Sequence, residues 1–282
     1  MTSLLSIQTD SNVLVPLYEN TIDHASDVIL ILPAMGVRAS FYKALSNSFK
    51  EHQIANYILE QRGQGRSIEK PSRHSSFGYK DYILNDLMGA IEHIKHKHPK
   101  AKIHCIGHSL GGHMALTLKA LKPCNFDNLI LCASGSPYIG AFKGKQYYGG
   151  KFLCFIAPML ISILGYFPGQ FVGFAGKEYP QLFRDWLNLA RDDHFNFKGL
   201  NDNIEAQFKR IEGNILCFSF QEDDFAPITA SLCFLDRLDL MEKKVVSVTS
   251  DDIGVKADHF SWAKSPEFIV SKVKQWLQET PN

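Results

Sequence analysis

Short runs of apolar residues recur along this chain, and stretches with a helical pattern of apolar positions separate them. The runs lie at 13–18, 28–32, 54–59, 102–106, 128–133, 214–220 and 244–249. Most are apolar throughout, which is typical of parallel strands that are covered on both faces. Their alternation with helices predicts an α/β fold, built on a doubly wound and mostly parallel sheet.

The alternation is interrupted between residues 136 and 205. This stretch is rich in glycine, proline and aromatic residues and contains no convincing strand. We interpret it as a helical cap, so that residues 1–135 and 206–282 form the two parts of the core. Its longest apolar run, 152–167, is shorter than the roughly 20 residues of a membrane-spanning helix. We therefore expect a buried or lid segment there, and no transmembrane segment.

Two helices outside this interruption have recognisable ends. Residues 81–97 place their apolar side chains on one face, and Pro99 follows at a position where helices commonly stop. The last helix is expected to begin at "SPEF", with Ser265 as its N-cap and Pro266 as its first helical residue.

The charge of the chain bears on nucleic-acid binding, and its cysteines bear on its cellular compartment. The chain has 30 Lys and Arg against 29 Asp and Glu, so its net charge of +1 offers no electrostatic basis for binding nucleic acid. Its first residues lack the basic start and apolar core of a signal peptide, and its six cysteines include no CxxC pair. We expect a cytoplasmic protein with reduced thiols.

The three histidines of "HIKHKH" (93–98) are interpreted as a basic last helical turn, without a metal.

The most informative segment is "KIHCIGHSLGGHMALTLKAL", residues 102–121. It places a G-x-S-x-G motif, Gly107 to Gly111, between an apolar strand and a helical pattern. This context is that of a nucleophile elbow, in which Ser109 stands exposed at the strand end and the helix N-terminus faces an anion. The alternative is a glycine-rich turn with an idle serine.

A serine nucleophile needs a base, and the base needs an acid that orients it. Behind such an elbow the acid and then the histidine follow the serine along the chain. His259 is the only histidine after residue 194 and lies between the last expected strand and the last helix. The acid should follow strand 214–220, where "QEDDFAP" offers Glu222, Asp223 and Asp224.

An acyl-transfer site also needs hydrogen-bond donors for an oxyanion. One is the backbone N–H of Leu110, which directly follows the serine. The other should lie in the loop after strand 28–32, where Met35 is the best candidate and Gly36 permits close approach of the backbone. A plain strand–helix connection is the alternative, because backbone donors leave no signature in the side chains.

Four blocks in this order resemble the α/β-hydrolase superfamily: "LPAMGVRASFY", "EQRGQGRS", "GHSLGG", and "QEDDFAP" with "DHF". The block "EQRGQGRS" is similar to a D-x-R-G-x-G-x-S turn with Glu60 at the aspartate, and "LPAMGVRASFY" has Pro33-Ala34 where the family often has His-Gly. The segment "GYFPGQFVGFAGKEYPQLFRDW" resembles the cap of a bacterial group near the serine aminopeptidase and monoglyceride-lipase types. In the family the triad acid often lies four residues before a proline. That spacing favours Asp223, with Asp224 as the alternative.

The resemblance implies a serine hydrolase that cleaves an ester or related acyl bond. Ser109 would be the nucleophile, His259 the base and Asp223 the orienting acid, with the oxyanion bound by the N–H groups of Met35 and Leu110. No metal or organic cofactor is required, and the partner would be a small acyl compound with an apolar acyl group. Transient contact with a lipid surface, acyl transfer, aminopeptidase action and a non-catalytic binding module on the same fold stay open, as do the substrate-binding residues and the oligomeric state.

Overall fold

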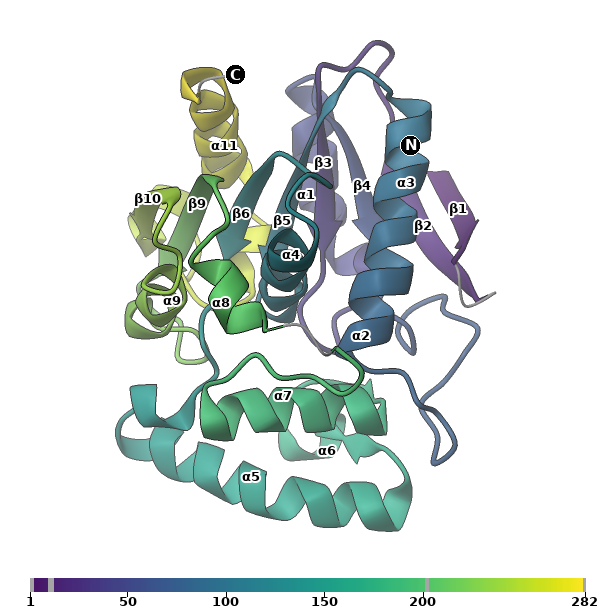
Figure 1. The fold of residues 1–282 in the computed structure, drawn as a ribbon. Coiled ribbons are helices and arrows are strands. Elements are labelled where there is room, and N and C mark those ends of the chain that lie inside the picture. Colours follow the sequence, from purple (N-terminus) through teal and green to yellow (C-terminus); the bar gives the residue numbers. More distant parts are fainter. Residues whose placement is uncertain (1–2, 10–12, 201–202, 281–282) are drawn as a thin grey trace.

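One large sheet runs through the molecule, and a layer of helices lies below it (Figure 1). The computed structural model describes residues 3–9, 13–200 and 203–280. Its eight-stranded sheet has the order β1-β2-β4-β3-β5-β6-β9-β10. The strands are β1 (Ser3–Gln8), β2 (Leu14–Asn20), β3 (Asp27–Leu32), β4 (Ala55–Leu59), β5 (Lys102–His108), β6 (Asn128–Cys132), β9 (Gly213–Phe220) and β10 (Met241–Val248). Every pair from β4 to β10 is parallel, and β2 pairs antiparallel with β1 and β4.

Helices cover both faces of this sheet, as the apolar strands predicted. In β3, Ile29 and Ile31 pack into the apolar layer beneath α1 (Lys43–Glu51) and α11 (Glu267–Glu279), whereas Leu30 and Leu32 pack into the layer beneath α3 (Met88–Lys97) and α4 (Leu110–Leu121). Because successive strand residues face opposite sides, a strand buried on both faces must be apolar throughout. The predicted α/β-hydrolase architecture, a mostly parallel and doubly wound sheet, is therefore confirmed.

The chain between β6 and β9 forms a helical layer below the carboxyl ends of the strands (Figure 1). It contains η3 (Ile139–Ala141), α5 (Gly144–Leu164), α6 (Gly169–Val172) and α7 (Pro180–Asp192). We call this layer the cap; its predicted limits at residues 136 and 205 stay a prediction. The remaining helical segments are η1 (Ala39–Tyr42), α2 (Tyr79–Asp81), η2 (Tyr82–Leu87), α8 (Ile204–Phe208), α9 (Ile228–Leu235), α10 (Ser250–Ile253) and η4 (Ser261–Ala263).

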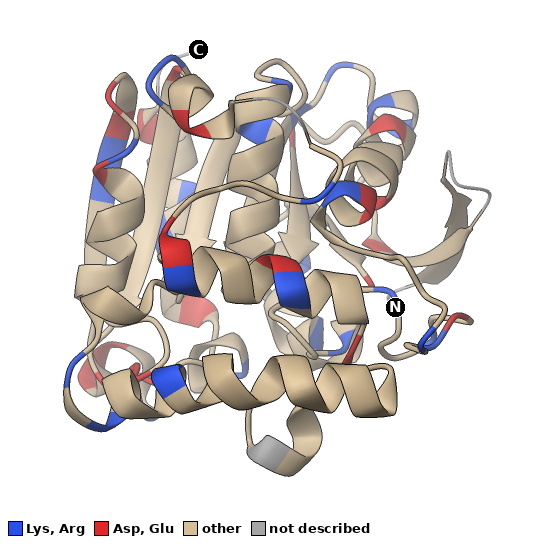
Figure 2. Ribbon diagram, turned by 60° about the horizontal axis from the view of Figure 1, so that its bottom comes forward, with Lys and Arg blue, Asp and Glu red and all other residues tan. Residues whose placement is uncertain are grey.

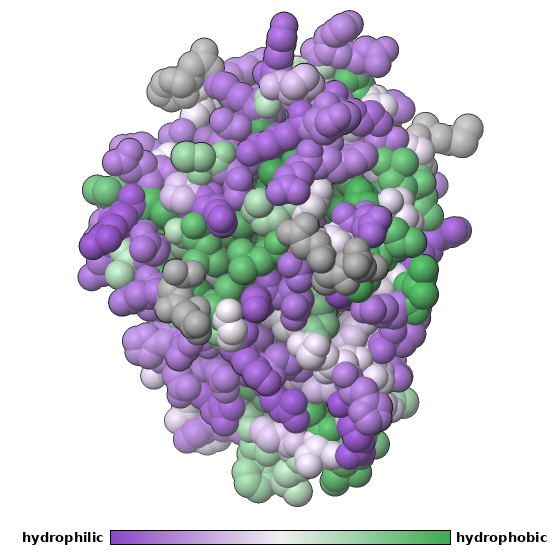
Figure 3. Space-filling model, turned by 45° about the vertical axis from the view of Figure 1, so that its right-hand side comes forward, coloured by the Kyte–Doolittle hydropathy of each residue, from purple (hydrophilic) through white to green (hydrophobic). Residues whose placement is uncertain are grey.

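The longest helix of the cap, α5, is a surface helix. Of its side chains only Ala157 and Ile161 are buried, so the expected lid segment is much less buried than its composition suggests. Within the described residues it is the one helix long and apolar enough to cross a membrane by length and composition, with 21 residues. It bears no acidic residue (Figure 2), and apolar side chains emerge at the end of the molecule that it forms (Figure 3).

Four local predictions were wrong or incomplete. The edge strand β1 was not expected. The cap contains two short strands, β7 (Phe167–Pro168) and β8 (Lys177–Glu178), which pair antiparallel. The predicted helix 81–97 contains the π-helical segment η2 directly after the end of α2 at Asp81. The last helix begins at Glu267, one residue later than predicted, and Ser265 Oγ donates to the carbonyl of Ile253 instead of capping the helix.

Candidate active site

Ser109 lies at a sharp turn between β5 and α4. Its backbone has φ 51° and ψ −114°, a conformation that residues with a side chain rarely adopt. Two bonds hold the turn: Ser109 N–H donates to the carbonyl of Cys132 (3.2 Å), and Ser134 Oγ donates to the carbonyl of Ser109 (2.8 Å). Backbone strain that persists in a buried setting is typical of functional sites. The strand–turn–helix context predicted for the motif is thus present.

The glycines of the motif make this turn sterically feasible. A Cβ on Gly107 would lie 2.3 Å from the Cα of Gly112, and a Cβ on Gly111 would lie 2.2 Å from the carbonyl oxygen of Leu32. Both distances are far below van der Waals contact, so neither position accepts a side chain. The tight packing brings α4 directly behind Ser109.

Asp223 and His259 face one another in the loops that follow β9 and α10. His259 Nδ1 lies 3.0 and 2.9 Å from the two carboxylate oxygens of Asp223, and both side chains are buried. Asp223 Oδ1 also accepts from the backbone N–H groups of Phe225 and Ala226, each at 2.8 Å. On the other side, Trp262 Nε1 donates to the carbonyl of His259 at 3.1 Å. The carboxylate and the imidazole are therefore held from several directions.

The two neighbouring acids point elsewhere. Asp224 is exposed, and its Oδ1 accepts from Gln146 of α5 at 3.0 Å. Glu222 is exposed as well and accepts from Ser250 Oγ. Of the three predicted candidates, only Asp223 contacts His259.

A small cavity joins the predicted residues. Its volume is about 70 Å³, and Ser109, His259, Met35 and Leu110 all line it. The rest of the lining is Ala34, Phe225 and Phe260 from the core and Gly173, Phe174, Ala175 and Trp186 from the cap. Across residues 3–9, 13–200 and 203–280, the structure shows no hydrogen bond between Ser109 and His259, and none from the backbone N–H of Met35 or Leu110. Catalytic hydrogen bonds are often long before substrate binds.

Sequence reasoning missed a buried pair, Tyr42 and His108, beneath this cavity. Tyr42 Oη accepts from the backbone N–H of Ala34 at 2.9 Å and lies 2.7 Å from His108 Nδ1. Burial, together with the nearby His259, lowers the pKa of His108 well below its usual value, so its imidazole is neutral. The pair links the loop that carries Met35 to the residue before Ser109. The G-x-S-x-G motif allows any residue at position 108. The only signal in the sequence was therefore that a histidine directly precedes Ser109.

Another missed group fastens the cap to the core beside Met35. Glu178 of β8 accepts from Gln61 Nε2 at 3.0 Å and from Gln64 Nε2 at 3.3 Å. The carboxylate is fully buried, and this burial raises its pKa to about 7. Next to it the cap backbone at Gly176 packs so closely on Gly36 that a Cβ on Gly36 would lie 2.1 Å from the nitrogen of Gly176. Both glutamines belong to the "EQRGQGRS" block, which the family resemblance had singled out without this role.

Two other histidine groups have structural surroundings. His113 is buried between Tyr79 Oη (3.2 Å) and the carbonyl of Gly135 (3.1 Å), and burial lowers its pKa to about 4. In the predicted basic turn, His98 Nε2 lies 2.9 Å from Tyr57 Oη. The described part of the chain shows no group of three His, Cys, Asp or Glu side chains that could hold a metal.

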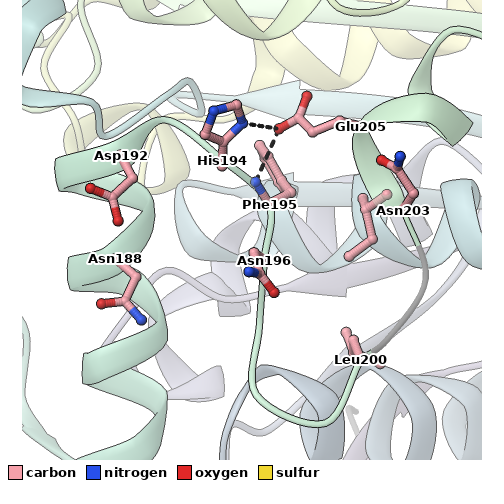
Figure 4. Close-up of a pocket in the computed structure, with 9 residues that line it drawn as sticks. Asn188, Asp192, His194, Phe195, Asn196, Leu200, Asn203 and Glu205 are labelled. Carbon is pink, nitrogen blue, oxygen red and sulfur yellow. Dashed lines mark hydrogen bonds and ion pairs between the residues drawn. The ribbon is translucent and has the colours of Figure 1, made fainter.

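A larger hollow of about 790 Å³ lies between the C-terminal end of α7 and α8 (Figure 4). Its polar groups serve the local fold: Glu205 accepts from the N–H of Phe195 at 3.0 Å and pairs with Arg237 at 2.8 Å. Neither Ser109 nor His259 lines it. We take the smaller cavity as the candidate active site because, unlike the larger hollow, it gathers the predicted nucleophile and base.

Comparison with known proteins identifies a family for this chain. Residues 23–163, half of the chain, match the family described as serine aminopeptidase, S33. The matched range includes Met35 and Ser109 and ends before Asp223 and His259. No curated protein matches the chain.

Solved structures with a similar fold cover nearly the whole chain. DcsB in complex with its substrate analogue has a TM-score of 0.70 and 13% identity, with 100% of both chains covered. A thermophilic esterase from Thermogutta terrifontis has a TM-score of 0.63 and 15% identity, with 98% of both chains covered. A bacterial membrane phospholipase A has a TM-score of 0.67 and 15% identity, covering 99% of this chain and 86% of the other. At these identities the likeness establishes the fold.

Proposed function

Because the chain belongs to the serine aminopeptidase S33 family of α/β hydrolases, we propose that it is a serine hydrolase that cleaves an ester or related acyl bond. The observation that carries the proposal is the convergence at one cavity. A strained serine meets a buried His–Asp pair there, together with two backbone N–H groups that have no partner within the described chain. A structural histidine needs neither the strained serine nor free donors beside it.

In this mechanism Ser109 Oγ attacks the acyl carbonyl while His259 Nε2 takes its proton. Asp223, bonded to Nδ1, holds the imidazole in the tautomer whose Nε2 can accept that proton, and it stabilises the imidazolium that forms. His259 then protonates the leaving alcohol, which leaves an acyl group on Ser109. Water activated by the same histidine releases the acid and regenerates the serine.

The oxyanion would be bound by the N–H groups of Met35 and Leu110. Leu110 is the first residue of α4, so its N–H lacks a partner within the helix, and the helix dipole favours negative charge there. A donor of this kind contributes on the order of 10²- to 10³-fold to the rate of acyl transfer. Tyr42 supports the arrangement because it holds the N–H of Ala34, which directly precedes Met35.

The lining of the cavity favours an uncharged acyl group over an amino-terminal peptide. It contains Phe174, Trp186, Phe225 and Phe260 but no aspartate or glutamate. An aminopeptidase that recognises a free ammonium group needs a carboxylate to pair with it, and Asp223 is already committed to His259. Two of the similar structures are an esterase and a phospholipase, which fits an ester substrate.

Labelling with a fluorophosphonate probe tests the nucleophile. The wild-type protein should be labelled and Ser109→Ala should not, with kcat on a p-nitrophenyl ester falling by at least about 10⁴-fold. Ser271→Ala, which changes an exposed serine on α11, should keep both properties. Equal labelling of Ser109→Ala and wild type would remove Ser109 from the mechanism. Faster hydrolysis of an aminoacyl p-nitroanilide than of any apolar ester would overturn the choice of substrate.

A further inference from the structure

The outward face of α5 is an apolar stripe. Its large side chains recur at intervals of four, three, four and four residues, which places them on one side of a helix over four turns. Each is at least half exposed: Tyr148, Phe152, Phe155, Met159 and Ile163. Phe171, on the short helix α6, is 78% exposed as well.

The buried side chains of α5 lie on its opposite face. The inward face of α5 supplies the packing through Ala157 and Ile161, which are buried in the main core. Burying a Phe or Ile side chain is worth about 1.5–3 kcal/mol, so a free surface of this kind is an unfavourable exposure to water. Large contiguous apolar patches on the surface of a protein mark sites of interaction.

The charged residues that the chain carries immediately around the stripe have a single sign, and an acid of the core, Asp224, contacts α5 at Gln146 in the first turn of the helix. Residues 128–177 contain Lys143, Lys145, Lys151 and Lys177 but no aspartate, glutamate or arginine. Lys143 and Lys145 flank the first residue of α5, and Lys151 lies between Tyr148 and Phe152 on the helix. Lysine stems can lie along apolar surface while their ammonium groups reach the polar layer above it. An apolar helix face with lysines at its margin matches an anionic lipid surface.

We propose that the stripe on α5 docks the protein on the surface of an anionic lipid membrane, with the helix lying in the plane of the headgroups. A spanning arrangement conflicts with the packing of Ala157 and Ile161 on the core. Another copy of the chain is a poorer partner, because two such faces would bring their lysines together and α5 carries no acid of its own to pair with them.

Docking in this position has a consequence for the cavity. Trp186 of α7 and Phe174 line the cavity and belong to the same cap as α5. A docked cap would thus hold the cap side of the cavity toward the layer in which an apolar acyl substrate partitions. This consequence rests on the proposed function, whereas docking itself does not depend on Ser109.

Co-sedimentation with vesicles tests the docking separately from the chemistry. The measurements use the full chain carrying Ser109→Ala, with vesicles of phosphatidylcholine alone or of phosphatidylcholine mixed with phosphatidylserine. We expect tighter binding to the vesicles with phosphatidylserine and weaker binding as salt rises. Adding Phe152→Ser and Phe155→Ser should weaken binding on the order of 100-fold. Lys145→Gln with Lys151→Gln should reduce the preference for phosphatidylserine by roughly five-fold per lysine.

Leu240→Ser is the matched control, since Leu240 is 54% exposed and precedes β10 at the opposite end of the strands. It should bind vesicles as the parent does. The Phe152 and Phe155 variant without Ser109→Ala should hydrolyse a soluble short-chain ester at the wild-type rate, which shows that it is folded. Absence of binding to both vesicle types, or equal binding by the Phe variant, would overturn the proposal. A dimer that the Phe variant dissociates, with no vesicle binding, would assign the stripe to another copy of the chain.

Discussion

The two walls of the candidate active site are held by different forces. On the core side, Asp223 accepts from two backbone N–H groups and from His259, and Ser109 is fixed by bonds to Cys132 and from Ser134. On the cap side, Phe174 and Trp186 are placed by ring contacts, with centroids 4.9 Å apart. Hydrogen bonds weaken steeply with small changes of angle, whereas apolar contact has little directional preference.

This difference assigns different tasks to the two walls. The core can hold reacting groups within the tolerance that chemistry needs, and it does so whatever occupies the cavity. The cap can adjust to different acyl groups, but it must do so by moving, because about 70 Å³ is far less than the several hundred Å³ of a typical ligand site. We therefore expect substitutions in the core wall to reduce turnover, and substitutions in the cap wall to change substrate range.

The largest effect should come from the acid on the core wall. Asp223→Asn keeps the size of the side chain but removes the charge that stabilises the imidazolium, so kcat should fall by about 10⁴-fold. Asp224→Asn changes an exposed group that contacts only the start of the cap, and it should alter kcat less than about two-fold. Steady-state kinetics on one soluble ester compares the two; a collapse in Asp224→Asn alone would exchange their roles.

The contact between the walls can be broken at Gly36. Gly36 and Gly254 both have left-handed backbones, with φ of 75° and 67°, but a Cβ on Gly254 meets nothing within 4 Å. Alanine at either position should cost about 1–2 kcal/mol of stability for the left-handed backbone, and at Gly36 the clash with Gly176 should add to that cost. Only Gly36→Ala should also lower kcat/KM, by about 10²-fold, because its Cβ displaces Gly176 and the loop of Met35. Denaturant titration paired with kinetics separates the two effects. Equal activity in both variants would show that the contact between Gly36 and Gly176 is not coupled to the candidate active site.

Tyr42 offers a smaller test within the core wall. Tyr42→Phe leaves the N–H of Ala34 and the Nδ1 of His108 without their partner, which should cost about 1–3 kcal/mol of stability. If Tyr42 positions the loop of Met35, kcat should fall about ten-fold while KM stays constant. A change confined to stability would mean that Tyr42 only supports the fold.

The smallest effect concerns Glu178, a buried carboxylate that fastens the cap. Burial raises the pKa of Glu178 to about 7 from an ordinary value of 4.5, so the folded state favours the protonated form. Between these two values the unfolded chain loses the proton first, and folding becomes less favourable as pH rises. The Tm of the wild type should therefore fall as the pH rises from about 5 to about 8. This fall should be at least about 3 °C larger than the fall in the Tm of Glu178→Gln over the same range. The difference between the two proteins removes the contribution of Asp86, whose pKa burial also raises to about 7. Parallel curves would exclude Glu178 as the cause.

Features that depend on local patterns could be predicted from the sequence. The central strands are apolar on both faces, so their positions follow from composition to within a few residues. The elbow follows from a local motif whose glycines are sterically required. The edge strand β1 could not be found in this way, because only Ile7 of its six residues is buried and its order comes from pairing with β2.

Contacts between distant segments were beyond the reach of local patterns. Gln61 and Glu178 are 117 residues apart, and nothing near either residue indicates the other. Proline spacing favoured Asp223 over Asp224, but it could not show that the N–H groups of Phe225 and Ala226 aim one carboxylate at His259. The exposure of α5 was equally hidden, because an apolar helix has the same composition whether it faces a core or a membrane.

The position of the cap in the chain has an evolutionary consequence. It leaves the sheet after β6 and returns at β9, and these two strands are hydrogen-bonded neighbours in parallel register. Any segment whose ends meet at that spacing can replace it without disturbing the ladder, and doubling its length adds only about 0.6 kcal/mol of loop-closure free energy. Exchange of one continuous stretch of gene would thus change the substrate range and the proposed membrane docking together, while the core framework stays unchanged.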